Sequence, residues 1–444
     1  MSFRRRVLLD ISPLRDSREF RLLWCGQAIS IVGRQVTVVA VPVQVYQQTG
    51  SSFAVGMVSL VQLGPLIVGS LWGGAVADAV DRRKLLIVAQ VLLALTSAGL
   101  AVNASLPEPA LWPIFLLTGL SAGVAGIDSP TRQAALPRLV GRDRFPAAAA
   151  LNQTLFQSGQ IIGPALGGLL IARVGLAAAY WVDVATFVGA IVAIVAMRPL
   201  PPEGGGTRPG LRSIAEGLRY LRGKRAVQGA FVVDINAMVF GMPRALFPAL
   251  GEGVYGGGPG VVGLLYAAPA AGALIGALTT GWINAVQRQG RAVLVSVAVW
   301  GGAIAAFGFT PWLAPALVLL AVAGAADVVS AVFRNTILQL SVPDRLRGRL
   351  SAVNVAVVTG GPRLGDAEAG AVAALTSTRV SVVSGGLACI AGVAMIARLL
   401  PELAGWRLDR HTVAVVEDDD GTLHTGPPDG SVDRNTSREP GAPG

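Results

Sequence analysis

The sequence predicts an all-α integral membrane protein in which about twelve transmembrane helices form two pseudo-symmetric six-helix bundles. Hydrophobic residues make up 52% of the 444 residues and charged residues only 14%, with a mean hydropathy of +0.59, whereas soluble domains carry about 25% charged residues. Apolar runs such as 110–127 and 370–396 approach the roughly 20 residues that a helix needs to cross a bilayer. An internal repeat divides the chain into two halves. This composition excludes a soluble enzyme.

Rare residues exclude several kinds of chemistry. The lysines, Lys84 and Lys224, are not followed by Ser or Thr, so the chain has no Gly-x-x-x-x-Gly-Lys-Ser/Thr phosphate loop. The histidines, His411 and His424, lie in the polar C-terminal tail, where they cannot build a catalytic triad or a zinc site among spanning helices. We therefore expect a protein that is not an enzyme and that uses no cofactor or metal.

The expected spans follow one another along the chain, each an apolar run of about the length of one crossing. In the first bundle they are 19–46, 52–77, 85–104, 110–131, 146–172 and 176–197. In the second bundle they are 226–250, 259–283, 292–309, 312–336, 351–376 and 380–400.

Basic residues in alternate connections orient these spans. They lie before the first span and after every second one, at 4–18, 82–84, 138–144, 198–225, 288–291 and 345–349. Four connections on the opposite side, around Gln47, Leu106, Tyr255 and Pro311, contain no Lys or Arg. Because cytoplasmic loops carry the positive charge, we expect a multi-pass protein of the plasma membrane with both termini in the cytoplasm. The net charge of +10 then reflects topology and attraction to membrane lipids, and no nucleic-acid partner is expected.

The internal repeat supports two halves. Gly56, Gly74 and Lys84 recur 207 positions later as Gly263, Gly281 and Arg291, while Arg132, Leu136 and Asn152 recur 202 positions later as Arg334, Leu338 and Asn354. The shared order at equivalent places favours duplication over chance matches in a Gly-rich chain. Parallel repeats of six spans are typical of transporters whose bundles rock around a central cavity.

The predicted domain organisation follows from these halves. It comprises a cytoplasmic N-terminus (1–18), an N-terminal six-helix bundle (19–197), a cytoplasmic linker (198–225), a C-terminal six-helix bundle (226–400) and a disordered cytoplasmic tail (401–444). In the linker, leucines and Ile214 recur at helical spacing opposite arginines, which predicts an amphipathic helix on the inner membrane surface. The tail is acidic and rich in Gly, Pro and Ser, so it cannot bury enough apolar surface to fold.

The segment GGAVADAVDRRK (73–84) resembles the loop motif between the second and third helices of the major facilitator superfamily. The matching residues are Gly74, Asp78, Arg82, Arg83 and Lys84. Asp81 replaces the usual Gly, which is similar to the branch of siderophore (enterobactin) exporters and macrolide efflux proteins. The resemblance implies a latch that, together with Asp128, joins the two halves on the inside when the transporter opens outward. A basic loop that only fixes topology is the alternative.

A second motif lies on the fifth span. The segment GQIIGPALGG (159–168) resembles the motif of the antiporter branches, with Gly159, Gly163, Pro164 and Gly167 in the matching places. The resemblance implies export. Close helix packing at small residues, with a kink at Pro164, also explains this pattern.

Charged and polar residues inside the spans are candidates for substrate binding, because an ionisable group in hydrocarbon is costly and should face a cavity or a partner. The candidates are Arg34, Gln35, Asp234, Asn236 and Arg244. Many relatives carry Asp at the place of Arg34, so we expect Arg34 to anchor an anionic or catecholate-like substrate. The alternative is a structural pair between Arg34 and a carboxylate such as Asp234.

The eleventh span contains the densest charge cluster, GGPRLGDAEAG (360–370). Proton coupling needs a carboxylate whose charge alternates with conformation beside a mobile Arg. The candidates are Asp234, Glu368, Asp366 and Arg363. Alternatively, Arg363 and Asp366 pair with each other and only hold helices together.

Together these features predict a monomeric secondary active transporter that exports an amphipathic, siderophore-like molecule, with the proton as coupling ion and alternating access as its mechanism. A broad-specificity, macrolide-like drug efflux pump is the first alternative. A lysophospholipid flippase and a non-transporting membrane scaffold are the others.

Overall fold

The computed structural model describes residues 10–201, 219, 221–342, 344–408, 415–417 and 423–425. The N-terminal half contains α1 (Ser12–Asp16), α2 (Arg18–Thr49), α3 (Ser52–Ala79), α4 (Arg82–Ser105), α5 (Leu111–Val140) and α6 (Phe145–Val195). The C-terminal half contains α8 (Arg225–Phe240), η2 (Arg244–Leu246), α9 (Phe247–Ala249), η3 (Leu250–Val254), α10 (Gly258–Leu278), η4 (Thr280–Ala285), α11 (Gln289–Phe309), α12 (Leu313–Ser341), α13 (Asp344–Leu375), α14 (Thr378–Leu399) and α15 (Pro401–Gly405). In the tail, β1 (Val415–Glu417) pairs antiparallel with β2 (Leu423–Thr425). Apart from this short pair of strands in the tail, the elements of the described chain are helices. The predicted all-α membrane fold is therefore confirmed.

Polar side chains cap the N-termini of α2 and α4, and a glycine ends α2. Ser17 Oγ accepts a hydrogen bond from Phe20 N at 3.1 Å and caps α2. Asp81 Oδ1 accepts one from Arg83 N at 2.8 Å and caps α4. Gly50 ends α2 in the left-handed conformation, with φ of 62°, which residues with a Cβ adopt only at a cost.

Ten helices of the described chain are long and apolar enough to cross a membrane. One of the ten, α6, has 51 residues, which is long enough for two crossings. Its helical geometry breaks at Gly175, where φ is 87°. Its two parts fit the expected spans 146–172 and 176–197. The 32-residue α13 is not among the ten, because charged residues occupy its middle. The number of twelve crossings stays a prediction.

The seventh expected span, 226–250, coincides with the candidate span Arg225–Val254, but its helix is interrupted. The helix α8 ends at Phe240, and a bend at Gly241 precedes the short helices η2, α9 and η3. Pro243 follows at once, and its ring removes a backbone donor and disfavours a helical conformation in the residue before it. Trp300 Nε1 donates to the carbonyl oxygen of Gly241 at 2.8 Å, which satisfies a backbone group that the break leaves open.

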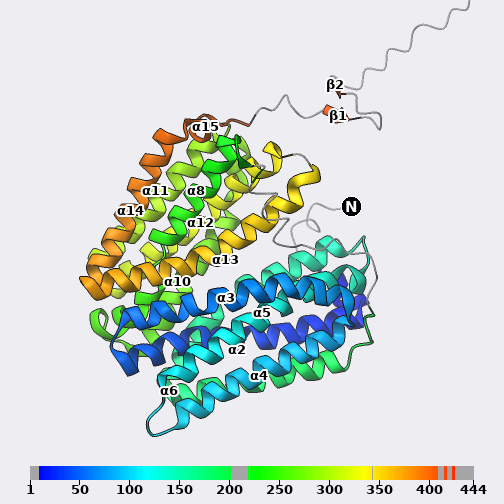
Figure 1. Ribbon diagram of the computed structural model, residues 1–444, viewed down its shortest axis with the longest axis vertical. Coiled ribbons are helices and arrows are strands. Elements are labelled where there is room, and N and C mark those ends of the chain that lie inside the picture. The colour runs from blue at the N-terminus through cyan, green and yellow to red at the C-terminus, as the bar shows by residue number, and fades with distance from the viewer. Residues whose placement is uncertain are drawn as a thin grey trace, which may run out of the picture.

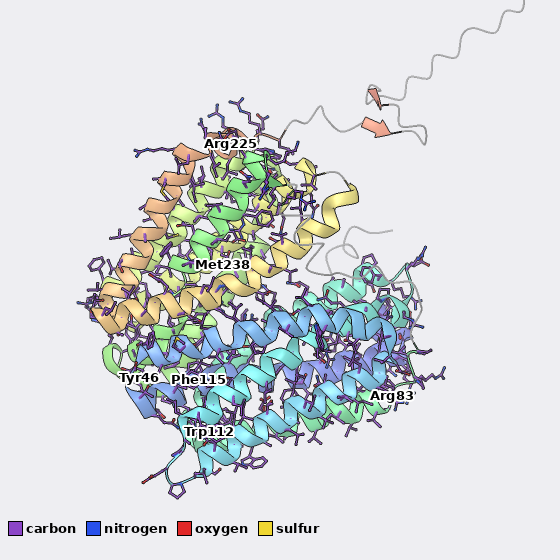
Figure 2. All side chains as sticks on the ribbon, in the orientation of Figure 1. Tyr46, Arg83, Trp112, Phe115, Arg225 and Met238 are labelled. Atoms are coloured by element: carbon purple, nitrogen blue, oxygen red, sulfur yellow. The ribbon has the colours of Figure 1, made fainter. Side chains whose placement is uncertain are left out.

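The two halves meet at one end of the molecule and diverge at the other (Figure 1). In Figure 2, Tyr46, Trp112 and Phe115 lie toward the end at which they meet, whereas Arg83 and Arg225 mark the ends that separate. The meeting end is joined by a hydrogen bond from Gln47 Nε2 to Glu252 Oε1, at 3.0 Å. Contacts between the halves run mainly from α3 to α13 and from α6 to α10.

Glycines let the backbones of the two halves approach closely. A Cβ atom on Gly263 of α10 would lie 2.9 Å from the Cα atom of Gly168 on α6, and a Cβ on Gly168 would lie 2.8 Å from the Cα of Gly263. A Cβ on Gly370 of α13 would lie 2.6 Å from the carbonyl oxygen of Ser52. Small residues at such crossings permit the dispersion contacts that hold membrane helices together.

The beginning of the predicted disordered tail is ordered, which corrects the expectation for 401–408. Leu403 of α15 is fully buried against Gly229 of α8 and Gly290 of α11. Trp406 Nε1 donates to Ser341 Oγ at 3.2 Å, and Glu402 pairs with Arg225 at 3.0 Å. The apolar side chains of this segment find a partner surface that the average composition of the tail does not reveal. The linker helix predicted near 211–221 falls outside the described residues, apart from 219 and 221.

Candidate functional site

A cavity of about 340 Å³ lies between the two halves, within the range of about 300–1,000 Å³ that is common for small-molecule sites. It is lined by residues of α2, α3, α4, α5 and α6 on one side and of η2, α10 and α13 on the other. Its ionisable lining residues are Arg34, Asp183, Arg244, Tyr266, Arg363 and Asp366. Three of the predicted site arginines and one predicted carboxylate thus share one cavity.

Arg34 lines this cavity from the middle of α2 and is partly buried. Among the described residues its guanidinium has no hydrogen bond and no carboxylate within ion-pairing distance. It interacts at longer range with Asp128 and Asp183, which attract it, and with Arg132, which repels it. Its predicted structural partner Asp234 is engaged elsewhere, with Arg334.

The two halves of the internal repeat engage their equivalent arginines differently. In the C-terminal half, Asp234 on the first long helix, α8, lies 2.8 Å from Arg334 on α12. The repeat equivalent of Arg334 is Arg132 on α5, and it pairs at 2.8 Å with Asp128 of its own helix. In the N-terminal half the acid thus comes from the same helix as the arginine, whereas in the C-terminal half it comes from α8.

Asp183 on α6 lines the cavity, although it was not among the site residues predicted from the sequence. Its side chain is only 1% exposed, and its Oδ2 atom accepts hydrogen bonds from Thr37 Oγ1 at 2.6 Å and Ser97 Oγ at 2.7 Å. The signal in the sequence was an aspartate in the middle of a span, but the hydroxyl donors lie on α2 and α4, far away in the chain.

Asp366 on α13 connects the two halves. Its Oδ2 atom accepts a hydrogen bond from Ser59 Oγ of α3 at 2.7 Å, and its Oδ1 atom accepts one from Ala245 N at 3.0 Å. Arg363 attracts Asp366 at longer range, and its Nη1 atom donates to the carbonyl oxygen of Thr359 at 2.6 Å. The predicted pairing between Arg363 and Asp366 is therefore absent among the described contacts.

Arg244 lines the cavity from η2, and its guanidinium has no hydrogen bond or ion pair within the described part of the chain. Its carbonyl oxygen accepts a hydrogen bond from the hydroxyl of Tyr266 at 3.1 Å. This contact fixes the irregular segment that follows the break after α8. Arg244, a predicted substrate-binding residue, thus lines the cavity from the irregular segment after the break.

Four predicted site residues lie away from the cavity lining. The Nε2 atom of Gln35 donates to Gln160 on α6, and Asn236 Nδ2 donates to the carbonyl oxygen of Cys389 at 2.9 Å. Asp234 belongs to the buried pair with Arg334. Glu368 on α13 is partly buried and does not line the cavity.

The described part of the latch motif is bonded within the N-terminal half. Arg82 Nη1 donates to the carbonyl oxygen of Ala134 at 3.1 Å, and Arg83 Nε donates to that of Ile194 at 3.2 Å. Gly74 and Asp78 belong to α3, but the surroundings of both residues lie outside the described part of the structure. Asp128 also accepts a hydrogen bond from Gln90 Nε2 at 3.0 Å. A latch between the halves stays a prediction.

The antiporter-like motif packs α6 against α2. Gly159 faces Ile31, Gly163 faces Gln35, and a Cβ on Gly167 would lie 2.9 Å from the Cα of Val36. Pro164 lies within the same helix, and its carbonyl oxygen approaches Gly263 of α10. The motif thus holds α2, which carries Arg34, against α6, which carries Asp183.

Comparison with known proteins relates this geometry to a family. The family described as transmembrane secretion effector matches residues 9–412. The enterobactin exporter EntS of Shigella boydii is 32% identical over 400 residues, which cover 90% of this chain and 96% of that protein. Among solved structures, the nucleoside transporter NupG has a TM-score of 0.70 at 12% identity, covering 87% of this chain and 98% of that one. A D-xylose-proton symporter has a TM-score of 0.67 at 14% identity, covering 88% and 99%. These solved structures share the fold with this chain.

Proposed function

Because this chain belongs to the major facilitator superfamily, in its transmembrane secretion effector family, we propose that it is a secondary active exporter. It moves an amphipathic, siderophore-like organic anion out of the cytoplasm by alternating access, in exchange for entering protons. The observation that carries this proposal is Arg34, a guanidinium without an ion pair to any described residue that lines a cavity between the two halves. Similarity to an enterobactin exporter supports a siderophore-like cargo.

The arrangement of the halves supports alternating access. They are joined at the end that carries Gln47 and Glu252 and diverge at the end that carries Arg83 (Figures 1 and 2). In the proposal the basic end faces the cytoplasm, so this arrangement corresponds to an inward-open state. Arg82 and Arg83 bond to their own half here and engage the other half after the transporter opens outward.

Proton exchange needs a carboxylate that the cavity can reach and that can be neutralised there. Asp366, one of the predicted coupling residues, meets this requirement, and its hydrogen bond to Ser59 ties its protonation to the contact between the halves. Asp183 also meets it and joins the candidates. Glu368 and Asp234 remain candidates for a state in which the helices have moved, because they do not line the cavity in this one.

The test is transport into inside-out vesicles that contain the full-length protein. The cargo panel comprises a catecholate siderophore, a macrolide and a lysophospholipid, each with and without a pH gradient. We expect gradient-driven uptake of the siderophore only. An anion is also driven out of a negative interior by about 2.3 kcal/mol per charge per 100 mV, so the pH gradient and the membrane potential must be set separately with ionophores.

Variants make this test specific. Arg34→Gln should reduce uptake of the siderophore about ten-fold or more, since one charge-assisted contact contributes roughly 1.5–3 kcal/mol. Arg173→Gln, at an exposed arginine of α6 outside the cavity, is the matched control and should transport at the parental rate. Equal uptake of the siderophore by the Arg34→Gln variant and the parent would refute the anchor.

A macrolide-like drug efflux pump is the second candidate. Apolar side chains contribute much of the cavity wall, among them Val41, Val55, Val58, Leu100 and Phe187. Such a wall binds neutral amphipathic molecules through apolar contact. Gradient-driven uptake of the macrolide that Arg34→Gln leaves unchanged would favour this function over siderophore export.

A further inference from the structure

The cavity holds positive charge at two separate places. Arg34 comes from α2 in the N-terminal half, whereas Arg244 and Arg363 come from η2 and α13 in the C-terminal half. Arg244 and Arg363 repel each other, and Asp366 attracts both at a distance beyond an ion pair. Arg34 interacts instead with charges of its own half, and neither C-terminal arginine contributes appreciably to its electrostatic environment. We call Arg34 the N-pole and the pair of Arg244 and Arg363 the C-pole.

The carboxylates of the cavity do not occupy these poles. The Oδ2 atom of Asp183 accepts hydrogen bonds from two hydroxyl groups, and both oxygens of Asp366 accept bonds from Ser59 and Ala245. Neither aspartate is within ion-pairing distance of an arginine of the cavity in the described structure. Donors of both poles therefore remain available to a ligand, and a buried guanidinium favours a carboxylate-like partner.

Apolar side chains line the same cavity as the poles. Val41 of α2 and Val55 and Val58 of α3 line the cavity, and Phe187 of α6 lies in the same wall. A ligand with a single acidic group forms an ion pair with one pole and leaves the guanidinium groups of the other without a close ion pair, although carboxylates attract them at longer range. A ligand with acidic groups at both ends of an apolar body satisfies both.

We propose that the cargo is a two-headed organic anion, with acidic groups on an apolar or aromatic body, one of which binds Arg34 while another binds Arg244 and Arg363. This inference rests on the proposed export function because it assigns the cargo of the same cavity. Each half holds one end of the molecule, so a bound cargo ties the halves together across the cavity. A shorter or one-headed anion does not form this bridge.

The experiment measures binding to the purified full-length protein in detergent, without any ion gradient. The probes are naphthalene-2,6-dicarboxylate, a rigid two-headed aromatic anion, and 2-naphthoate, which has the same ring system and one carboxylate. We expect the dicarboxylate to bind at least about ten-fold more tightly. Arg34→Gln and Arg363→Gln should each lower its affinity about ten-fold, toward that of 2-naphthoate. Neither variant should change the affinity for 2-naphthoate more than about two-fold, because this ligand can use the remaining pole.

Charge-preserving and exposed variants control for folding. Arg34→Lys and Arg363→Lys should retain part of the preference for the dicarboxylate, because a point charge remains but the planar fork is lost. Arg173→Gln should bind both probes as the parent does, and thermal unfolding of all variants identifies any that are misfolded.

Several results would overturn the two-headed cargo. These are equal affinity of the parent for both probes, no binding of the dicarboxylate, or an unchanged dicarboxylate affinity in either glutamine variant. Equal losses for both probes in Arg34→Gln would indicate a site with one pole. A failure of the two-headed cargo is distinguishable from a failure of the proposed export. The first is measured as binding of the dicarboxylate in detergent, and the second is measured as gradient-driven transport in vesicles.

Discussion

The buried pair of Asp234 and Arg334 is structural in this conformation, and Asp234→Asn separates that role from proton coupling. The ion pair joins α8 to α12 at 2.8 Å, with side chains only 2% and 7% exposed. Removal of one partner of a buried pair costs about 3–5 kcal/mol, because the other charge stays buried without compensation. Two features of the site favour the lower end of that range. Asp327 lies 4.0 Å from Arg334 and can take over part of the charge, and the pair with Asp234 is not an aligned hydrogen bond.

The assay is a double-mutant cycle on unfolding of the purified protein in mixed detergent and sodium dodecyl sulfate. Asp234→Asn should lower the unfolding free energy by about 3 kcal/mol, and Arg334→Met should lower it by a similar amount. The double variant should be more stable than the sum of the two single losses predicts, because both members of the ion pair are then absent and neither is buried without the other. Normal stability of Asp234→Asn combined with loss of pH-driven transport would refute the structural reasoning and favour a coupling role.

Four further predictions concern particular residues. Asp183→Asn should retain substrate binding but lose pH-driven transport in vesicles, whereas unchanged pH-driven transport would remove Asp183 from the coupling mechanism. Leu403→Ala should lower the unfolding free energy by about 2–5 kcal/mol because this side chain is fully buried, and unaltered unfolding in detergent would show that α15 does not stabilise the C-terminal half. Gly263→Leu should prevent the close approach of α6 and α10 and weaken crosslinking between cysteines introduced at their outer ends, which an unchanged crosslinking yield would contradict. Asp78→Asn should leave insertion intact and disfavour the outward-open state, measured by crosslinking of the inner loops; parental transport together with unchanged crosslinking would show that the latch assignment is wrong.

Much of the helical layout could be predicted because it depends on local properties. Apolar run length places the spans, and the positive φ of Gly175 falls where the gap between the fifth and sixth spans was expected. The break after Phe240 was missed because the run through Leu250 remains apolar, so its hydropathy does not reveal the change in backbone geometry. The docking of Leu403 was missed for the opposite reason, since two apolar side chains do not alter the polar average of the tail.

The sequence by itself determined that ionisable groups such as Arg34, Asp234 and Asp366 must face a partner or a cavity, because hydrocarbon does not solvate them. Only the tertiary structure decided which of these residues faces a partner and which faces the cavity. Asp234 meets Arg334, Asp366 meets Ser59 of the other half, and Arg34 lines the cavity without an ion pair. The physical reason is that a side chain's neighbours depend on how whole helices rotate and cross, and residues that meet here are separated by as many as 307 positions. Local periodicity carries no information about that separation, whereas the cost of an unsolvated charge is a property of the residue itself.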